Sequence, residues 1–268
     1  MSLSRAGSAK PPQIARFRTD AMGEYVIINL PLTRSISIII PAYNEEKRLP
    51  ATLVKVREYL AGSRWDFSEI VVVNDGSRDG TAKVAHDAGV RVVENPGNRG
   101  KGYTVKHGML EARGEWILYT DADLSAPIGE LEKLWAAAER ADAKVAIGSR
   151  ALDRSLVGVH QPRVRELVGR AFNLMMRLVT GLPFRDTQCG FKLFDTAAAR
   201  RIFARQLLDG FGFDVEVLYI ARRLSFRAVE VPVKWNDVAG TKVSMLRGLA
   251  AFSDLLRVRW NGVRGKYN

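Results

Sequence analysis

The sequence is poor in cysteine and histidine and contains no long hydrophobic run. Its 268 residues include 1 cysteine and 3 histidines, which excludes an internal disulfide framework and a zinc site built on cysteines. A single cysteine also favours a reducing compartment. No apolar stretch approaches the roughly 18–20 residues that cross a bilayer, and the first residues lack a signal-peptide core. We therefore expect a globular protein that carries no membrane anchor of its own.

Acidic residues are outnumbered, because 41 lysines and arginines against 29 aspartates and glutamates give a formal charge of +12. This balance favours an anionic partner: nucleic acid, an acidic lipid surface or a phosphorylated substrate. The aromatic residues are not interleaved with basic ones along strands, as stacking on single-stranded nucleic acid requires. We therefore expect no nucleic-acid partner, which leaves a lipid surface, a phosphorylated substrate, or a basic surface without a function.

A strand–turn–helix pattern repeats through the first half of the chain. Apolar, β-branched runs end in polar turns, and helical spacing follows each turn. The expected strands are Ser35–Ile40, Ile70–Val73, residues 90–94, residues 115–120 and residues 144–150. The alternation predicts an α/β fold with a doubly wound, mostly parallel sheet flanked by helices. Residues 1–33 are expected to form an N-terminal extension and residues 34–268 a single domain.

The polar turns PAYNEE, NDGSRDGT, GNRGKG and DADLS follow these strands. In a doubly wound sheet, ligands bind outside the carboxyl ends of the strands, so the turns should converge on one site. Asp121 and Asp123 follow a buried strand, where an Asp-x-Asp pair is suited to Mg²⁺ or Mn²⁺ that bridges to substrate phosphates. Alone the pair is a weak signal, because Asp-x-Asp is common in loops. The three neighbouring polar turns favour the metal-site interpretation.

The turn GNRGKG places Arg99 and Lys101 among glycines, as in a cradle for a diphosphate built from backbone N–H groups and cationic side chains. The turn matches neither the phosphate loop nor the dinucleotide fingerprint, which counts against a P-loop nucleotidase and a nicotinamide dehydrogenase. Glu45 and Asp75 end the first two strands, where their carboxylates can accept hydrogen bonds from a nucleobase. The histidines have no partners that would form a serine–histidine–aspartate set.

Two basic amphipathic helices are expected in the second half, Arg163–Leu182 and residues 246–260. In the first, Arg163, Arg170 and Arg177 recur every seven residues, while Met175 and Leu178 belong to the apolar face. Each helix can pack against the core with a solvated basic face. Two such helices in a chain of net charge +12 also fit a role at a membrane surface.

Eight motifs together resemble one family, in the expected order and from about Ser35 to Tyr267. They are IIIPAYNEEKRLP, VVVNDGSRDGT, NRGKGYTVKHGML, YTDADLS, GSR, RDTQCGFKLF, FDVEVLYIA and EVPVKWNDVAGTKV. The chain is similar to the family-two inverting glycosyltransferases of the GT-A fold, and more narrowly to the polyprenyl-phosphate sugar synthases. DTQCGFKLF, FDVE and EVPVKW favour the dolichyl-phosphate β-glucosyltransferase branch over the mannosyl branch.

The resemblance implies roles for individual residues. It assigns nucleotide binding to Pro41, Tyr43, Glu45, Asp75, Arg99, Lys101 and Asp121. It assigns Mg²⁺ or Mn²⁺ to Asp121 and Asp123, the acceptor phosphate to Arg150, Arg165 and Lys242, and catalysis to Asp123, Asp186 and Arg150.

Two positions depart from the family pattern. Asn74 stands where the family usually has the first aspartate of Asp-Asp-Gly-Ser, so the nucleobase contact would rest on Asp75 alone. Ser125 stands where mannosyl members usually carry glutamine, which favours glucose over mannose. The anchor of some eukaryotic glucosyl members has no counterpart here, so the mode of membrane attachment stays open.

The resemblance implies metal-dependent, inverting transfer of a hexose, glucose from UDP-glucose, to a polyprenyl phosphate, dolichyl or undecaprenyl. The enzyme would work as a peripheral protein on the cytoplasmic face of a membrane. A phosphate monoester has a second pKa of about 6, so its oxygen attacks as an anion. We therefore expect Asp186 to orient groups rather than to remove a proton.

Three alternatives remain. They are a GDP-mannose-dependent polyprenyl-phosphate mannosyltransferase, a family-two transferase with a soluble or polysaccharide acceptor, and a non-catalytic nucleotide-sugar sensor. The oligomeric state does not follow from the sequence.

Overall fold

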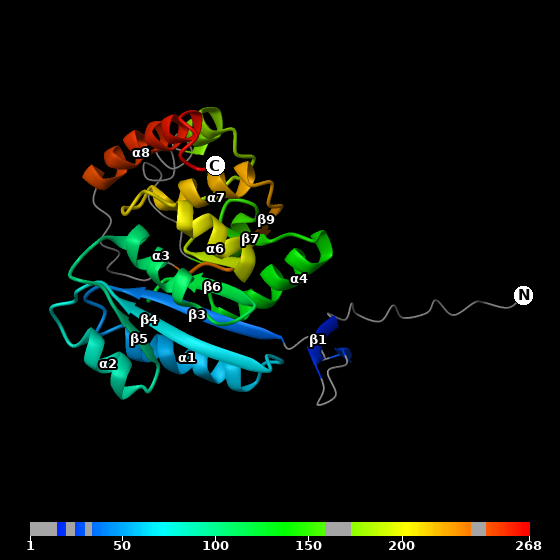
Figure 1. Cartoon of the computed structure of the whole chain (residues 1–268). Coiled ribbons are helices and arrows are strands. Elements are labelled where there is room, and N and C mark those ends of the chain that lie inside the picture. Colours follow the sequence, from blue (N-terminus) through cyan, green and yellow to red (C-terminus); the bar gives the residue numbers. More distant parts are fainter. Residues whose placement is uncertain (1–14, 20–24, 30–33, 159–172, 237–244) are drawn as a thin grey trace, which may run out of the picture.

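The computed structural model describes residues 15–19, 25–29, 34–158, 173–236 and 245–268. Its centre is a sheet of 7 strands with helices on both faces (Figure 1). The strands are β3 (Ser35–Ala42), β4 (Phe67–Asn74), β5 (Arg91–Glu94), β6 (Trp116–Thr120), β7 (Val145–Ser149), β8 (Phe191–Asp195) and β9 (Ala228–Pro232). The predicted α/β class with a mostly parallel sheet is confirmed.

The strand order is β5-β4-β3-β6-β8-β7-β9. From β3 the chain adds β4 and β5 on one side, and then crosses to place β6 on the other side of β3. The sheet therefore has its topological switch point between β3 and β6, which is where open α/β sheets typically bind ligands. β8 runs antiparallel to both β6 and β7, whereas the other pairs of the sheet are parallel.

The central strands are covered on both faces, which explains their continuous apolar sequence. Because successive side chains of a strand point to opposite faces, Ile38 and Ile40 join one core while Ile39 joins the other. All three isoleucines are fully buried. Val72 and Val73 of β4 divide between the two cores in the same way.

Helices α3 (Lys101–Glu111), α6 (Thr196–Arg205) and α7 (Phe213–Arg223) cover one face, and α8 (Met245–Val263) packs outside α7. Helices α1 (Leu49–Ala61), α2 (Thr81–Asp87) and α4 (Leu131–Ala141) cover the other, with the short turn η1 (Ile128–Glu130) between α1 and α4. A second short turn, η2 (Arg154–Leu156), follows β7. Helix α1 buries Leu49, Leu53 and Val56, which have the spacing of a single helix face.

The antiparallel strand β8 changes which residues reach the ligand-binding edge. Parallel strands bring their carboxyl ends to this edge, so their polar turns follow them in sequence. β8 brings its amino end instead, as the pairing of Thr120 with Phe191 at the end of β6 requires. The residues just before β8, including Asp186 and Gly190, therefore join the turns after the parallel strands.

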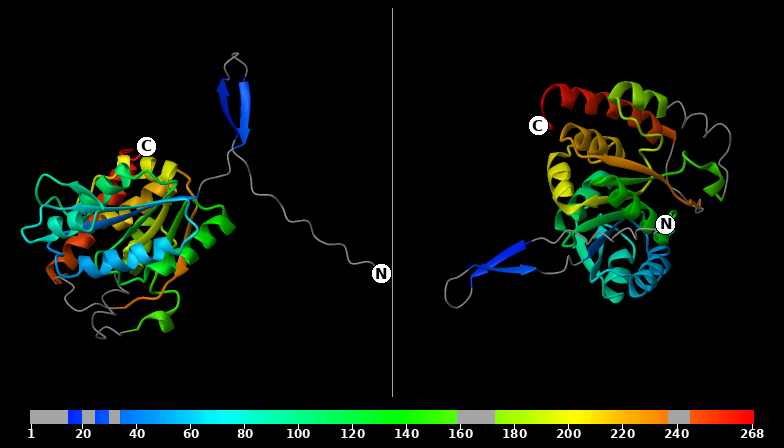
Figure 2. Two further views of the ribbon diagram at one scale, coloured as in Figure 1. Left: turned by 90° about the horizontal axis from the view of Figure 1, so that it is seen from below. Right: turned by 90° about the vertical axis from the view of Figure 1, so that its right-hand side faces the viewer.

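Two short strands near the N-terminus form a separate antiparallel sheet, β1 (Ala15–Thr19) with β2 (Tyr25–Asn29). Figure 2 shows this hairpin in dark blue, away from the large sheet. Within the described ranges, no helix has the length and apolarity needed to cross a membrane.

Only part of the first predicted basic helix lies within the described residues, as a helix over residues 173–180. Met176 packs in the core beneath it, although the predicted apolar face did not include this residue. Met175 and Leu178 of that face are 43% and 76% exposed. Val179 of the same face packs against the core. Within this segment, the predicted apolar face is therefore divided between solvent and the core.

Candidate active site

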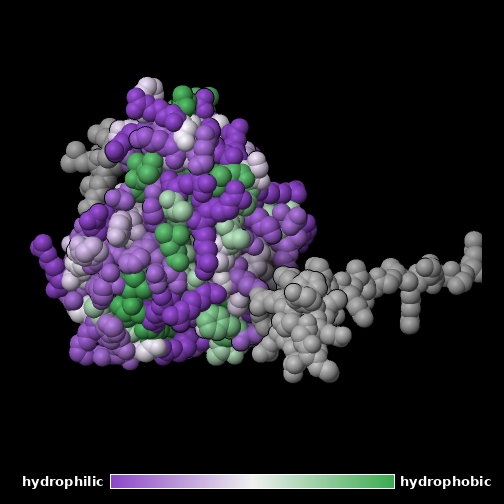
Figure 3. Space-filling model, in the orientation of Figure 1, coloured by the Kyte–Doolittle hydropathy of each residue, from purple (hydrophilic) through white to green (hydrophobic). Residues whose placement is uncertain are grey.

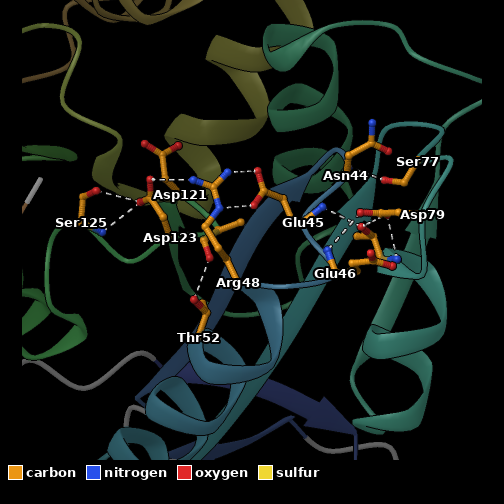
Figure 4. Close-up of polar contacts among 12 residues, drawn as sticks. Asn44, Glu45, Glu46, Arg48, Thr52, Ser77, Asp79, Asp121, Asp123 and Ser125 are labelled. Carbon is orange, nitrogen blue, oxygen red and sulfur yellow. Dashed lines mark hydrogen bonds and ion pairs between the residues drawn. The ribbon is translucent and has the colours of Figure 1, made fainter. Parts of the chain in front are cut away.

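The loop after β3 and the loop after β4 are tied together by hydrogen bonds (Figure 4). The Asn44 N–H donates to Ser77 Oγ (3.0 Å), and the Glu46 N–H donates to Asp79 Oδ2 (3.2 Å). In return, the Gly80 N–H donates to Glu46 Oε2 at 2.7 Å. Most polar residues of NEE and GSRDGT thus hold the two loops in place, a role that the sequence analysis did not assign.

Asp75 is buried and anchors the glycine-rich turn. Its Oδ1 accepts from Asn95 Nδ2 (2.8 Å) and from the Arg99 N–H (2.8 Å), and its Oδ2 accepts from the Gly100 N–H (3.0 Å). A carboxylate offers about four acceptor positions, so three of them are used within the protein. A nucleobase contact by Asp75 stays a prediction, and it would use the remaining capacity.

The amino end of α3 is occupied by a backbone carbonyl. The N–H groups of Gly102 and Tyr103 both donate to Asp209 O, at 2.7 and 3.2 Å. Asp75 and Asp209 thus accept hydrogen bonds from four N–H groups of this turn and helix. A diphosphate cradle at this turn stays a prediction. The turn can also bind an anion through its cationic side chains. One of these is Arg99, whose guanidinium carbon lies 4.9 Å from the centre of the Tyr103 ring.

Asp121 is held between α3 and the residues before β8. Lys101 Nζ lies 2.7 Å from Asp121 Oδ1, and the Asp121 N–H donates to Gly190 O at 3.2 Å. Burial alone would lower the pKa of Lys101, but Asp121, aided by Asp214, raises it above its ordinary value. A methyl group at position 190 would lie only 2.0 Å from Asp121 Oδ2, so glycine is required for the carboxylate to sit there.

Asp123 is held by Ser125 on one side and faces Arg48 on the other (Figure 4). Its Oδ1 accepts from the Ser125 N–H (3.0 Å) and Oγ (2.9 Å), and its Oδ2 lies 3.9 Å from Arg48 Nη1. Arg48 also donates from Nε to Glu45 Oε2 at 2.6 Å, and a second bond makes this pair bidentate. Hydrogen bonding to Glu45 raises the pKa of Arg48 despite partial burial, and Asp123 adds to the effect.

Asp121 and Asp123 supply two carboxylates of the kind that Mg²⁺ and Mn²⁺ prefer. In the part of the chain that the structure describes, no cluster of three or more histidine, cysteine or acidic side chains is arranged to hold a metal. These residues therefore fit a cation that completes its shell with substrate phosphates and water, as is common for Mg²⁺, rather than a cage made by protein alone.

Arg150 and Asp186 form the most completely bonded ion pair of this edge. Arg150 Nε and Nη2 donate to the two oxygens of Asp186 at 2.6 and 2.8 Å, and the Arg150 N–H adds a third bond at 3.0 Å. Although burial opposes it, Arg150 holds the pKa of Asp186 below its usual range. The guanidinium also lies 4.9 Å from the centre of the Trp235 ring, and Glu230 accepts from the Asp186 N–H at 2.8 Å.

Lys192 and Asp214 form a buried ion pair that the sequence analysis did not single out. Lys192 is fully buried, and its Nζ bonds to Asp214 Oδ1 and to Cys189 O (2.7 Å). The Tyr119 hydroxyl donates to the same Asp214 oxygen at 3.2 Å. Lys192 lies in the motif FKLF and Asp214 in FDVE. A lysine in the middle of an apolar strand was the feature of the sequence that could have revealed the pair. Removing one partner of such a pair leaves an uncompensated buried charge.

Comparisons with known proteins identify the family. Residues 37–207 match the model of glycosyl transferase family 2. The chain belongs to glycosyl transferase family 2. It is a glycosyltransferase of the GT-A fold.

Several curated relatives of this transferase are dolichyl-phosphate beta-glucosyltransferases. The Drosophila melanogaster protein is 39% identical over 226 residues, which cover 78% of this chain and 69% of that protein. The human protein is 35% identical over 253 residues, covering 88% of this chain and 78% of its own. The Trichomonas vaginalis protein ALG5D is 37% identical over 239 residues, which cover 83% of this chain and 72% of that protein.

Solved structures agree on the fold. Glucosyl-3-phosphoglycerate synthase from Mycobacterium tuberculosis, in complex with Mn²⁺, UDP-glucose and phosphoglyceric acid, superposes with a TM-score of 0.63. The alignment covers 85% of this chain and 80% of that one, at 19% sequence identity.

The expected site residues of the transferase are partly brought together. Asp75 and Arg99 meet at the glycine-rich turn, Lys101 meets Asp121, and Glu45 reaches Asp123 through Arg48. Pro41 is in β3, and Tyr43, just after it, is 37% exposed. Arg165 and Lys242 lie outside the described residues, so their acceptor-phosphate role stays a prediction.

Replacing Gly190 by alanine should displace the Asp121 carboxylate from its place beside Lys101, because the added methyl group clashes with it. We expect glycosyl transfer to fall by about tenfold or more, since a displacement of about 1 Å at a catalytic centre has effects of that size. The measurement is the transfer rate, with thermal denaturation as a check on folding. Gly129→Ala is the matched control, because a methyl group there has no neighbour within 4 Å; equal loss in both variants would contradict the assignment.

Proposed function

We propose that this glycosyltransferase transfers glucose from UDP-glucose to a polyprenyl phosphate, with inversion at the anomeric carbon and with a bound divalent cation. The proposal depends on one observation: beside the switch point of the sheet, Lys101 pairs with Asp121 and Arg48 faces Asp123. The names of the curated relatives support glucose as the sugar and dolichyl phosphate as the acceptor.

The donor would lie across the loops after β3, β4 and β6. Arg99 is exposed on the glycine-rich turn, and Lys101 is partly buried beside Asp121. Both side chains would neutralise charge that develops on the leaving diphosphate. Asp121 and Asp123 would hold Mg²⁺ or Mn²⁺, which supplies further positive charge to the leaving group. The Mn²⁺ complex of the Mycobacterium tuberculosis neighbour is consistent with a divalent cation in this fold.

The acceptor phosphate would lie near Arg150, which follows β7. This guanidinium is fixed by Asp186 and by the Trp235 ring, so it offers an oriented positive charge. A phosphate oxygen is anionic at neutral pH, so the attacking group needs no strong base. Asp186 is poorly suited to take a proton, because both its oxygens accept from Arg150 and its pKa is held low. We therefore assign it to orientation of Arg150.

The membrane-facing surface would be formed by α8 and residues 173–180, which lie beside each other in Figures 1 and 2. Their buried sides share one core, with Met176 on one helix and Leu255 and Val258 on the other. Their outer sides expose large apolar residues: Leu174, Met175, Leu178, Leu256, Trp260 and Val263.

Two arginines lie among the apolar side chains of α8. Arg257 and Arg259 line a shallow hollow together with Leu256, Trp260 and Val263. Figure 3 shows hydrophobic atoms in green among hydrophilic ones at the top of the molecule, where these helices lie. Apolar groups with arginines beside them fit the boundary region of an anionic bilayer. We propose that the enzyme binds peripherally there, on the cytoplasmic face.

Purified protein, Mn²⁺ or Mg²⁺, dolichyl or undecaprenyl phosphate and labelled nucleotide sugars test the reaction directly. We expect label from UDP-glucose to become butanol-extractable, and chelation of the metal to abolish the transfer. Label from GDP-mannose instead would assign the mannosyl reaction. Transfer only to phosphoglycerate or another soluble phosphate would assign a soluble acceptor, as in the structural neighbour. No transfer from any donor would contradict the proposal.

The variant Asp186→Asn tests the orienting role. Loss of the charge pair should free Arg150 and raise the KM for the polyprenyl phosphate about tenfold, while the pH dependence of kcat stays as in the wild type. A hydrogen bond to a charged group contributes roughly 1.5–3 kcal/mol, and the lower end of this range corresponds to about tenfold. If the wild type instead showed a pH dependence of kcat from one basic group, and Asp186→Asn abolished that dependence, Asp186 would be a general base.

The double variant Leu256→Ala, Trp260→Ala should weaken binding to vesicles of phosphatidylcholine and phosphatidylserine by tenfold or more. Burying one large apolar side chain contributes about 1.5–3 kcal/mol. Co-sedimentation in low salt measures the partition. Phe67→Ala, which removes an exposed aromatic ring elsewhere on the surface, is the control. Equal partition of all three proteins would contradict this membrane-facing surface.

A further inference from the structure

Arg48 is the one cation in Figure 4 that faces both the nucleotide-side and the metal-side carboxylates. It makes a bidentate pair with Glu45 and lies 3.9 Å from Asp123 Oδ2. The side chains are largely withdrawn from water, with 26% of Arg48, 13% of Glu45 and 16% of Asp123 exposed. The sequence analysis gave Arg48 no role.

The backbone fixes the position of this guanidinium. Arg48 is the residue before α1, and its N–H donates to Glu45 O at 3.0 Å, as does the N–H of Leu49 at 2.9 Å. One turn later, Thr52 Oγ1 donates to Ala122 O at 2.7 Å, which attaches α1 to the residue between the two aspartates. The loop after β3 and the loop after β6 therefore both fix the start of α1, and with it the position of Arg48 at the switch point.

We propose that Arg48 is an internal counter-cation that keeps Asp123 from binding a divalent cation tightly until a nucleotide diphosphate is present. The inference rests on the proposed function, because it takes Asp121 and Asp123 as the metal-binding carboxylates. Arg48 is a positioning residue in this scheme, since it acts on the metal through Asp123.

Charge explains the effect. A cation about 4 Å from a ligand oxygen repels a metal that binds there, and partial burial leaves the repulsion poorly screened. Glu45 holds Arg48 back from a direct hydrogen bond to Asp123, so the guanidinium opposes the metal without closing the site. A diphosphate brings negative charge that attracts both the metal and the guanidinium. Metal and nucleotide would then bind together.

Mn²⁺ titration of the nucleotide-free protein, followed by the electron paramagnetic resonance signal of free Mn²⁺, tests the proposal. In Arg48→Gln the amide can still donate to Glu45 but the charge is gone. We expect the Mn²⁺ dissociation constant of this variant to fall about tenfold without nucleotide. We also expect the addition of UDP to change the constant less in this variant than in the wild type. Arg48→Lys keeps the charge and should bind Mn²⁺ as the wild type does. Arg48→Met serves as a second neutral variant if glutamine impairs folding.

Lys55→Gln is the matched control, because Lys55 is exposed on the same helix and its loss changes the net charge equally. It should change the Mn²⁺ constant less than twofold. Equal tightening in Lys55→Gln and Arg48→Gln would overturn the inference, as would an unchanged or weaker constant in Arg48→Gln. Asp123→Asn separates the two claims: Mn²⁺ binding that survives this change contradicts the proposed metal site itself. Binding lost in Asp123→Asn but unaltered in Arg48→Gln overturns only the role of Arg48.

Discussion

The buried and partly buried carboxylates along the binding edge of the sheet are stable because each is held by a cation or by N–H groups from a neighbouring turn. Lys101 holds Asp121, Arg48 faces Asp123, Arg150 holds Asp186 and the glycine-rich turn holds Asp75. A carboxylate withdrawn from water without such a partner would be protonated or would turn outward. The pairing therefore fixes where each negative charge points, and with it the geometry of the proposed site.

The same constraint explains why the site is built from lysine and arginine rather than histidine. The proposed reaction between a nucleotide sugar and a phosphate monoester would bring two anions together, and its attacking oxygen would already be charged. Such a site has to neutralise and align negative groups, which guanidinium groups do through planar, paired hydrogen bonds. The exposed apolar side chains of α8 belong to the proposed membrane-facing surface, from which a lipid-bound phosphate would reach the site.

The sequence predicts the sheet and its binding edge well, because these follow from local periodicity. Ile38 and Ile39 face opposite cores. Because both faces of the strand are buried, its residues are mostly apolar, and the strand is recognised in the sequence as one apolar run. The direction of β8 depends on long-range pairing, so the place of Asp186 came from the family resemblance alone. The contacts of Asp75 and Arg48 were missed for the same reason, since their partners come from other turns. Met176, which the predicted apolar face did not include, shares a core with Leu255 and Val258 of α8, and such a contact between distant segments cannot be read from helical periodicity.

A crystal soaked with Mn²⁺ and UDP tests the central claim most directly, through the anomalous scattering of manganese. We expect one strong peak coordinated by Asp121, Asp123 and the diphosphate, with Lys101 or Arg99 against the same phosphates. A manganese peak bound elsewhere, or a nucleotide seated away from the loops after β3 and β6, would contradict the assignment of this edge as the active site.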